Sequence, residues 1–284
     1  MPEGPEVAVL SNYFNKHYKD CTLKKIDILS GRYYLTEKEK KNAKSSKLID
    51  NLDALRSELP LKITKFNCKG KFIYWELEDD WYIFVTLGLK GRISVGDKED
   101  YNRVKFVTSC GNLYLRDKLN NGTINIYKGC ERVQKKLKTL GVDLLKSNMS
   151  IKDVAKTLRD KFKKKRNQDE LIGDLLLDQK YLAGVGNYIR ADALYCAKIS
   201  PFRKFVDITD DELETLIKCV KKIMTTSFTI QTESCKVKYF YEDVAICYIP
   251  LVYFREFTAK NEKVHNEKMK FQNRTIWYVP DVQK

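Results

Sequence analysis

The stretch that decides the fold reads Leu176-Leu177-Asp178-Gln179-Lys180-Tyr181-Leu182-Ala183-Gly184-Val185-Gly186-Asn187-Tyr188-Ile189. Gly184 and Gly186 predict a tight turn with close approach to the backbone, and Asn187 is a favourable N-cap for a following helix. A plain helical hairpin would not need two glycines. The open N–H groups at this helix start, beside the Asn187 amide, predict a phosphate site.

The chain around this stretch divides into a β-rich half and an α-rich half. A short helix is expected near Pro5, and alternating strands follow over 61–116. Strand character returns in the tail, at 246–254 and 275–279. Between these regions, helical spacing appears at 131–139, 150–163, 168–178, 187–198 and 209–225. The sequence therefore predicts an α+β fold.

The overall composition favours a polyanionic partner. Lys and Arg number 53 against 38 Asp and Glu, which gives the 284-residue chain a formal charge of +15. Nucleic acid is the simplest partner for such a charge. No apolar run approaches the ~18 residues of a membrane span, and the N-terminus lacks the features of a secretory signal. We expect an intracellular protein without membrane contact.

The eight cysteines predict reduced thiols rather than a metal site or disulfides. No C-x-x-C pair occurs, and only His17 and His265 supply imidazoles, so a structural zinc site has no support in the sequence. The absence of an export signal favours thiols over disulfides.

Residues 1–6, M-P-E-G-P-E, carry possible reaction chemistry. Removal of Met1 would leave Pro2 with a free secondary amine, whose neutral fraction is substantial near the usual α-amino pKa of ~7.7–8.0. Such an amine can attack a sugar C1′ and form an iminium. Glu3 and Glu6 place carboxyl groups beside it for proton transfer. The alternative is an N-terminal arm with a helix start, because Pro and Glu suit a first helical turn.

These residues resemble a known family. P-E-G-P-E after Met1 is similar to the signature of the formamidopyrimidine-DNA glycosylase/endonuclease VIII (Fpg/Nei) family, and residues 176–189 resemble its helix–two-turns–helix (H2TH) motif. Residues 252–256 (V-Y-F-R-E) and 273–280 (N-R-T-I-W-Y-V-P) resemble the two ends of its C-terminal zinc finger. No cysteine lies within that element here, which is similar to the zincless finger of the endonuclease VIII-like branch.

The resemblance implies a catalytic role for four residues. Pro2 would be the Schiff-base nucleophile, Glu3 the carboxyl that acts on the sugar ring oxygen and in elimination, and Glu6 a supporting carboxylate. Lys71 fits the family's lysine at the start of a β-strand, with Lys69 as its rival. No cofactor and no metal are expected.

The resemblance also implies the contacts to double-stranded DNA. Asn187 and Gly186 belong to the H2TH phosphate site, and Arg274 matches the DNA-contacting arginine of the finger. Leu89 takes the place of the methionine that fills the hole left by a flipped base. Residues 117–122 (D-K-L-N-N-G) lack the Arg and Phe that many members carry, so Leu119 is a partial substitute.

The fold implied is an N-terminal β-sandwich with an N-terminal helix over 2–130, a helical H2TH domain over 131–240 and a zincless-finger β-hairpin over 241–284, with DNA in a basic cleft. The function implied is a monomeric bifunctional DNA glycosylase/AP lyase of base excision repair, cutting by β,δ-elimination. Its substrates would be duplex DNA with an abasic site or an oxidised base, above all oxidised pyrimidines and also ring-opened purines. Such a protein would lie in the nucleus or another DNA-containing compartment. Two alternatives stay open: an AP lyase without glycosylase activity, and a catalytically inactive DNA-damage-binding protein.

Overall fold

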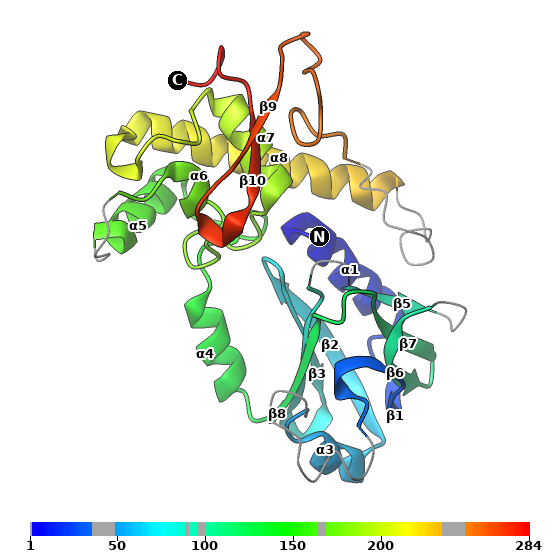
Figure 1. Cartoon of the computed structure of the whole chain (residues 1–284). Helices are drawn as coiled ribbons and strands as arrows, with labels where there is room; N and C mark the ends of the chain where they lie inside the picture. The colour runs from blue at the N-terminus through cyan, green and yellow to red at the C-terminus, as the bar shows by residue number, and fades with distance from the viewer. Residues whose placement is uncertain (1, 36–48, 89–90, 96–99, 164–168, 235–247) are drawn as a thin grey trace. The chain divides into compact units, whose positions relative to one another are not determined.

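Most of the chain is described by the computed structural model, namely residues 2–35, 49–88, 91–95, 100–163, 169–234 and 248–284. The described residues fall into two units (Figure 1). Pro2 and the residues from Glu6 to Lys138 make the first unit, and Glu3–Pro5 together with the residues from Thr139 onward make the second. Among the described residues, no helix combines the length and the apolar character that crossing a membrane requires.

The first unit is built around antiparallel strands. Its elements in chain order are α1 (Gly4–His17), β1 (Thr22–Ile28), η1 (Gly31–Tyr33), α3 (Leu52–Glu58), β2 (Leu61–Lys69), β3 (Phe72–Leu77), η3 (Glu78–Asp80), β4 (Trp81–Thr86), β5 (Gly91–Val95), β6 (Asn102–Thr108), β7 (Gly111–Asp117), β8 (Thr123–Lys128) and α4 (Glu131–Thr139).

The strands form one eight-stranded sheet that folds over into two layers. Its order is β5-β7-β6-β1-β2-β3-β4-β8, and the β1–β2 pairing covers only two residues on each strand. The rings of Trp75 on β3 and Phe106 on β6 lie 4.6 Å apart. Because two strands separate β3 from β6 in the order, a flat sheet would hold them ~14 Å apart. The predicted β-sandwich is therefore confirmed.

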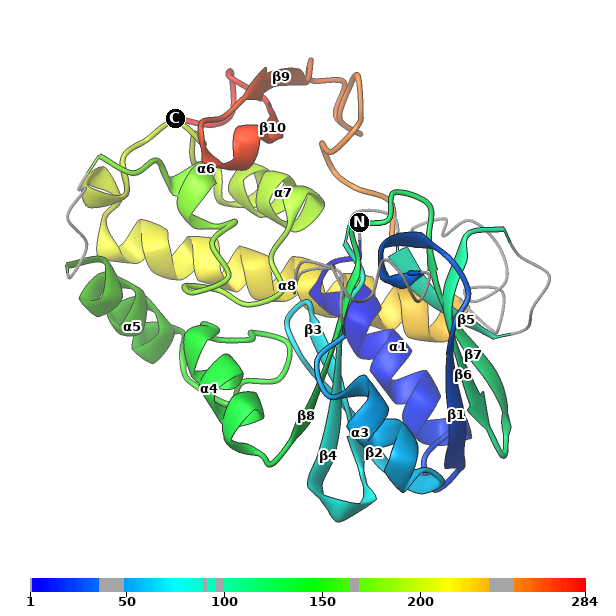
Figure 2. The same ribbon diagram turned by 60° about the horizontal axis from the view of Figure 1, so that its bottom comes forward.

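Helix α1 packs on β2 beside this sandwich (Figure 2). Ser11 donates its hydroxyl to the Phe66 carbonyl at 3.0 Å, and the Phe14 and Phe66 rings lie 5.2 Å apart. Phe14 is completely buried. These contacts hold α1, which directly follows the N-terminal residues, on the sandwich.

The cysteine prediction is wrong for one pair. Pairing of β1 with β6 places Leu23 opposite Thr108, and the neighbouring Cys21 and Cys110 form a disulfide with a Cα–Cα distance of 5.8 Å. Their 89-residue separation explains why spacing along the sequence could not indicate the bond.

The second unit is mainly helical. Its elements are α5 (Ile151–Lys163), α6 (Ile172–Leu175), α7 (Asn187–Ala197), η4 (Phe205–Asp207), α8 (Asp210–Ser234), β9 (His265–Lys268), η6 (Phe271–Asn273) and β10 (Thr275–Tyr278). Helix α7 packs against both α8 and β10. The residues Tyr188 to Leu194 are buried almost without exposure, so α7 is the central helix of this unit.

Two predicted elements differ from the structure. The helix expected over 168–178 is reduced to α6, four residues long. The C-terminal hairpin is present, but its first strand is β9, all of whose residues are exposed. The apolar segment 248–254, predicted as that strand, has no strand structure, because its backbone N–H groups bond to a buried side chain instead of to β10.

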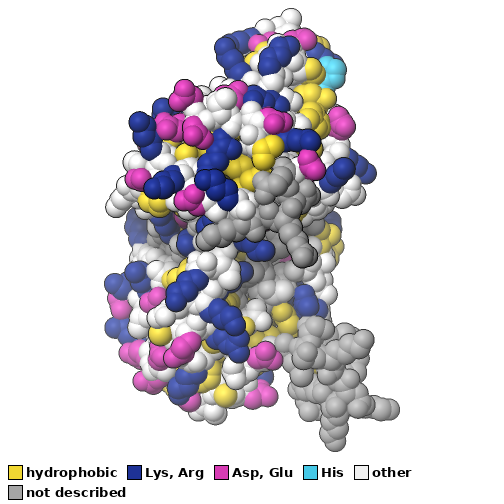
Figure 3. All heavy atoms as spheres, turned by 90° about the vertical axis from the view of Figure 1, so that its left-hand side faces the viewer, with side chains coloured by type: hydrophobic (Ala, Val, Ile, Leu, Met, Phe, Trp, Pro, Cys, Tyr) yellow, Lys and Arg dark blue, Asp and Glu magenta, His cyan; other side chains and the backbone are white. Residues whose placement is uncertain are grey.

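Basic side chains are interspersed with acidic ones on the face drawn in Figure 3. The net charge of +15 is thus not gathered into one patch on that face. Local geometry, rather than bulk charge, has to identify the candidate site.

Candidate active site

The N-terminal segment is tied to the second unit through Glu3 and Gly4. The Gly4 N–H donates to the Gly184 carbonyl with an N···O distance of 2.9 Å. Pro2 is half-buried directly before this contact, and consecutive Cα atoms lie only ~3.8 Å apart. Fixing Glu3 therefore also restricts the position of the predicted nucleophile, Pro2.

Glu3 caps the N-terminus of α7. Its carboxylate accepts hydrogen bonds from the backbone N–H groups of Tyr188, at 3.1 Å, and Ile189, at 3.4 Å, and only 3% of the residue is exposed. Both N–H groups belong to the first helical turn, which lacks acceptors within the helix, and the helix dipole favours an anion there. The prediction that these two N–H groups are open to a DNA phosphate is therefore wrong.

Gly186 makes the Glu3 contact possible. A Cβ atom at this position would overlap the Glu3 carboxyl group. Gly184 has φ +97°, a conformation that side chains disfavour, and its N–H donates to Gln179 Oε1 at 2.9 Å. The two glycines of the predicted turn thus serve the approach of the chain's own N-terminus.

A buried arginine that sequence reasoning missed holds Asn187. The Arg190 side chain has no exposed surface; its Nη2 donates to Asn187 Oδ1 at 3.2 Å and to the Thr275 carbonyl at 3.0 Å, while Nη1 donates to the Gly173 carbonyl at 3.0 Å. Burial lowers the pKa of Arg190 to about 10, and the nearby Asp174 and Glu3 oppose that shift. Arg190 therefore connects α6, α7 and β10 beside the predicted phosphate contact.

Tyr253 is a second residue that sequence reasoning did not single out, although it lies in the quoted V-Y-F-R-E stretch. Burial raises the pKa of its hydroxyl, as does the charge of Glu3, whereas a hydrogen bond from Asn187 and the charge of Arg274 lower it. The hydrogen bond places Tyr253 beside Asn187, and the charges of Glu3 and Arg274 act on its hydroxyl from a distance. Tyr253 is therefore a further candidate for the site, next to the predicted residue Asn187.

Arg274 follows directly on the turn of the hairpin. Gln272 and Asn273 both have positive φ, 55° and 51°, which reverses the chain before β10. The Arg274 carbonyl accepts from the Met269 N–H at 3.0 Å and closes the turn. The local backbone therefore fixes the position from which this guanidinium extends.

Asp192 anchors the segment that carries Tyr253. Its buried carboxylate accepts from the Tyr248 hydroxyl at 2.9 Å and from the N–H groups of Leu251 and Val252 at 2.8 and 3.0 Å. Burial raises the pKa of Asp192, and these hydrogen bonds oppose the shift. The segment 248–253 is consequently held on α7 without a β-ladder.

The remaining predicted catalytic residues lie in the first unit. Glu6 is buried in the first turn of α1, with 5% exposed. Lys71 lies in the two-residue turn between β2 and β3. The rival Lys69 is the last residue of β2 and donates its ammonium to the Leu137 carbonyl at 3.2 Å.

The two predicted apolar wedges have different outcomes. Leu89 lies outside the described residues. Leu119 is 46% exposed on the loop between β7 and β8. Asp117 shapes that loop by accepting from the N–H groups of Leu119 and Gly122 at 3.1 and 2.5 Å. Leu119 is therefore held at the surface by a defined turn.

Aromatic packing supports the hairpin. The Trp277 ring lies 4.7 Å from Tyr253 and 4.4 Å from Phe254, and Trp277 is 9% exposed. In the described part of the chain, His, Cys, Asp and Glu residues form no group of three that could hold a metal ion.

Comparison with known families decides the assignment. The formamidopyrimidine-DNA glycosylase N-terminal domain matches residues 1–124, and the formamidopyrimidine-DNA glycosylase H2TH domain matches residues 140–239. The chain belongs to the Fpg/Nei family. Similar Fpg/Nei proteins include a formamidopyrimidine-DNA glycosylase of Rickettsia massiliae, 24% identical over 81% of this chain and 77% of that protein, and one of Ureaplasma parvum, 28% identical over 80% and 78%.

Solved Fpg/Nei structures share the fold. Lactococcus lactis Fpg, crystallised with DNA that contains an abasic site, has a TM-score of 0.80 at 18% identity and covers 99% of both chains. MutM (Fpg) from Thermus thermophilus has a TM-score of 0.77 at 20% identity and covers 99% of this chain and 98% of its own. The likeness therefore extends over the sheet, the H2TH helices and the hairpin.

Proposed function

We propose that the protein is a bifunctional DNA glycosylase/AP lyase of base excision repair that acts through an N-terminal proline. The observation that carries this function is the position of Glu3, which the first turn of α7 holds by two hydrogen bonds directly after Pro2. A carboxyl with one orientation next to a secondary amine is the arrangement that nucleophilic and acid–base catalysis at a sugar requires.

The reaction begins when the damaged nucleotide leaves the DNA stack, at a cost of a few kcal/mol that is lowest for a weakened base pair. The Pro2 amine, freed of Met1, attacks C1′. The C1′–N bond breaks, and the base leaves with its electron pair and takes up a proton. Transfer of a proton to the ring oxygen, the role of Glu3, opens the sugar and gives the iminium.

Strand cleavage follows from the iminium. It acidifies the C2′ proton, whose removal drives out the 3′ phosphate by breaking the C3′–O bond. A second elimination breaks the C5′–O bond and releases the 5′ phosphate, and hydrolysis returns Pro2. Glu6 and Lys71 support these proton transfers, while Asn187 and Arg274 bind the phosphates on either side of the lesion.

Oxidised pyrimidines are the proposed preferred lesions, with ring-opened purines as further substrates. The tail after Cys247 contains no cysteine, which supports membership of the zincless-finger branch. Resemblance to that branch favours oxidised pyrimidines as substrates. The similar Lactococcus lactis Fpg has been crystallised with abasic-site DNA, with DNA that contains an oxidised pyrimidine and with DNA that contains Fapy-dG. Such lesions are thus compatible with the shared fold.

Borohydride trapping tests the function. Duplexes carrying an abasic site, thymine glycol or 8-oxoguanine are incubated with the protein, whose loss of Met1 is first verified by intact-mass spectrometry, and the imine is reduced. We expect a covalent complex on the abasic and thymine glycol duplexes, and none with Pro2→Gly. Trapping on the abasic duplex alone would indicate a lyase without glycosylase activity. Binding of damaged DNA without any trapping would indicate an inactive binding protein.

A further inference from the structure

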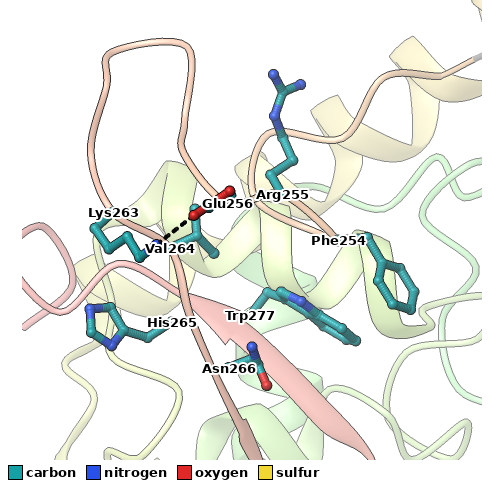
Figure 4. Close-up of a pocket in the computed structure, with 8 residues that line it drawn as sticks. All are labelled: Phe254, Arg255, Glu256, Lys263, Val264, His265, Asn266 and Trp277. Atoms are coloured by element: carbon teal, nitrogen blue, oxygen red, sulfur yellow. Dashed lines mark hydrogen bonds and ion pairs between the residues drawn. The ribbon is translucent and has the colours of Figure 1, made fainter.

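A cavity lies on the second unit, on the side of the hairpin drawn in Figure 4. Its volume is about 520 Å³, within the ~300–1,000 Å³ that small-molecule sites occupy. Neither Glu3, Asn187 nor Arg274 lines it. The lining side chains are Phe254, Arg255, Glu256, Lys263, Val264, His265, Asn266 and Trp277.

Phe254 is the unusual residue of this cavity. Its φ is +55°, a conformation that is a genuine outlier for a bulky side chain, and 73% of the residue is exposed. An exposed phenyl ring gains little burial energy that could offset the backbone strain. Strained backbone tends to persist where the side chain it presents is used.

The exposed Phe254 ring rests on a fixed aromatic base. It lies 4.4 Å from Trp277 and 4.6 Å from Tyr253, ring centre to ring centre. Figure 4 shows Phe254 and Trp277 side by side at one end of the cavity. Because the rings beneath it are themselves packed, the outer ring is already positioned to stack on a planar ligand.

The charge of the cavity favours an anion. The lining contains two cationic side chains, Arg255 and Lys263, and one carboxylate, Glu256, which pairs with Lys263 at 3.0 Å. The Arg255 guanidinium is held by the carbonyls of Pro250 and Phe257, at 3.2 and 3.3 Å, so its charge has a fixed place. Since Glu256 pairs with Lys263, the lining has one positive charge in excess. Figure 4 shows the Arg255 guanidinium directed away from the Phe254 and Trp277 rings, so this charge lies at the rim of the cavity, where a phosphate group could meet it.

Asn266 and His265 add donors and acceptors to the same cavity. Both side chains are exposed on β9. Figure 4 shows the Asn266 amide next to the Trp277 indole. An aromatic platform, a cationic rim and an amide for the edge of a base together form the kind of surface that binds single-stranded nucleic acid.

We propose that this cavity binds one unpaired nucleotide of a DNA strand, with its base stacked on Phe254 and its phosphate near Arg255 and Lys263, an inference that rests on the proposed DNA-repair function. A nucleotide fits the lining better than an apolar peptide does, because the lining carries one positive charge in excess and the polar side chains of His265 and Asn266 beside the aromatic rings. The site is separate from the Glu3 site that holds the reacting nucleotide.

Binding of fluorescein-labelled oligothymidine, eight nucleotides long, to the full chain at low salt tests the proposal. We expect Phe254→Gly to weaken binding by about 5- to 150-fold, the range found when one base–aromatic stack is lost. Glycine tolerates the positive φ of this position, so the fold should be retained, which thermal unfolding verifies. Val206→Ala, at an exposed apolar residue on η4 outside the lining, is the control and should change binding by less than about twofold.

Two further readouts locate the ligand. Asn266→Asp adds a negative charge at the cavity and should weaken binding several-fold. The oligonucleotide should quench the emission of Trp277, because Trp75 and Trp81 are buried in the first unit and out of its reach. This quenching should disappear in Phe254→Gly. Equal affinity of the wild type and Phe254→Gly, or an equal loss in Val206→Ala, would overturn the proposal.

The test also separates the cavity from the proposed enzyme. If borohydride trapping fails while oligothymidine binding still depends on Phe254, the nucleotide site stands and the enzymatic function is wrong. If trapping depends on Pro2 while oligothymidine binding is independent of Phe254, only the cavity assignment is wrong. Binding of an apolar peptide in competition with oligothymidine, unaffected by Asn266→Asp, would assign the cavity to a protein partner and overturn the nucleotide proposal.

Discussion

The carboxylate of Glu3 lies 3.1 Å from the backbone nitrogen of Tyr188 and accepts its hydrogen bond. A residue predicted for catalysis is thus also the cap of α7. The capping interaction restricts the carboxyl group to one place, and the same contact holds the adjacent Pro2 near the H2TH motif. Structural and chemical roles at this position are therefore inseparable, and substitutions should affect both.

Substitutions of Glu3 should separate its capping role from its catalytic role, because they change stability and activity to different extents. Glu3→Ala leaves two buried N–H groups without their acceptor and should lower the free energy of unfolding by about 1–2 kcal/mol. Glu3→Gln keeps an oxygen acceptor and should lower it by less, while still preventing proton transfer. Denaturant unfolding, compared with single-turnover trapping, measures both. An inactive, fully stable Glu3→Ala protein would contradict the capping role.

Gly186→Ala tests the close approach directly. The added Cβ overlaps the Glu3 carboxyl, so the carboxyl group must move while remaining chemically intact. A misplacement of ~1 Å commonly costs about 100-fold in rate, and we expect a loss of that size in single-turnover base release. Wild-type activity in Gly186→Ala would show that the rate does not depend on the Glu3 position.

Local sequence predicts some of this architecture and long-range contacts determine the rest. The turn at Gly184 and a helix from residue 187 follow from neighbouring residues, and both are confirmed. The predicted N-cap is wrong by one position, because Gly186 is the N-cap and Asn187 is the first helical residue. The cap from Glu3 comes from 185 residues away, which no local pattern encodes. Nor does it encode the three-way contact of Arg190, which depends on packing of α6, α7 and the hairpin.

The tail illustrates the same limit. Segment 248–254 has the apolar character of a strand, but Asp192, about 60 residues earlier, takes its N–H groups. Strand β9 is wholly exposed and therefore lacks the alternation from which strands are predicted. The hairpin was predictable from its resemblance to a family rather than from its periodicity.

Asp192→Ala should release the segment that carries Tyr253. Several donors would lose a buried acceptor, and each buried donor left without a partner costs about 1–3 kcal/mol. We expect unfolding at clearly lower denaturant concentration and weakened binding of abasic duplex. Asp160→Ala removes only a surface carboxylate 3.8 Å from Lys163 and should change stability by less than about 0.5 kcal/mol. Equal stability of the two variants would contradict the anchoring role.

The Glu212–Arg203 pair should make stability pH-dependent. The Arg203 guanidinium, 2.6 Å away, lowers the pKa of Glu212 to about 2. A pKa lower in the folded than in the unfolded state stabilises the protein above the unfolded value of 4.5, and this stabilisation is lost as the pH falls towards 2. Because the pair is partly exposed, solvent screening reduces it to about 1 kcal/mol.

Denaturant unfolding of wild type and Glu212→Gln over pH 2–7 measures this contribution. The stability difference should be largest near pH 6 and should disappear near pH 2. A difference that stays constant over this range would mean that the ion pair does not account for the lowered pKa.

Arg274 should contribute one phosphate contact. Arg274→Ala should weaken binding to duplexes of any sequence, and the slope of log K against log salt should become less steep by about 0.9, the value for one released counterion. Lys218→Ala, an exposed cation on the middle of α8, is the charge-matched control. Fluorescence anisotropy at salt concentrations from about 50 to about 300 mM, where phosphate contacts dominate the affinity, gives both slopes. An identical change of slope in both variants would mean that Arg274 adds only bulk charge, whereas a change confined to Arg274→Ala would place a phosphate at the hairpin turn.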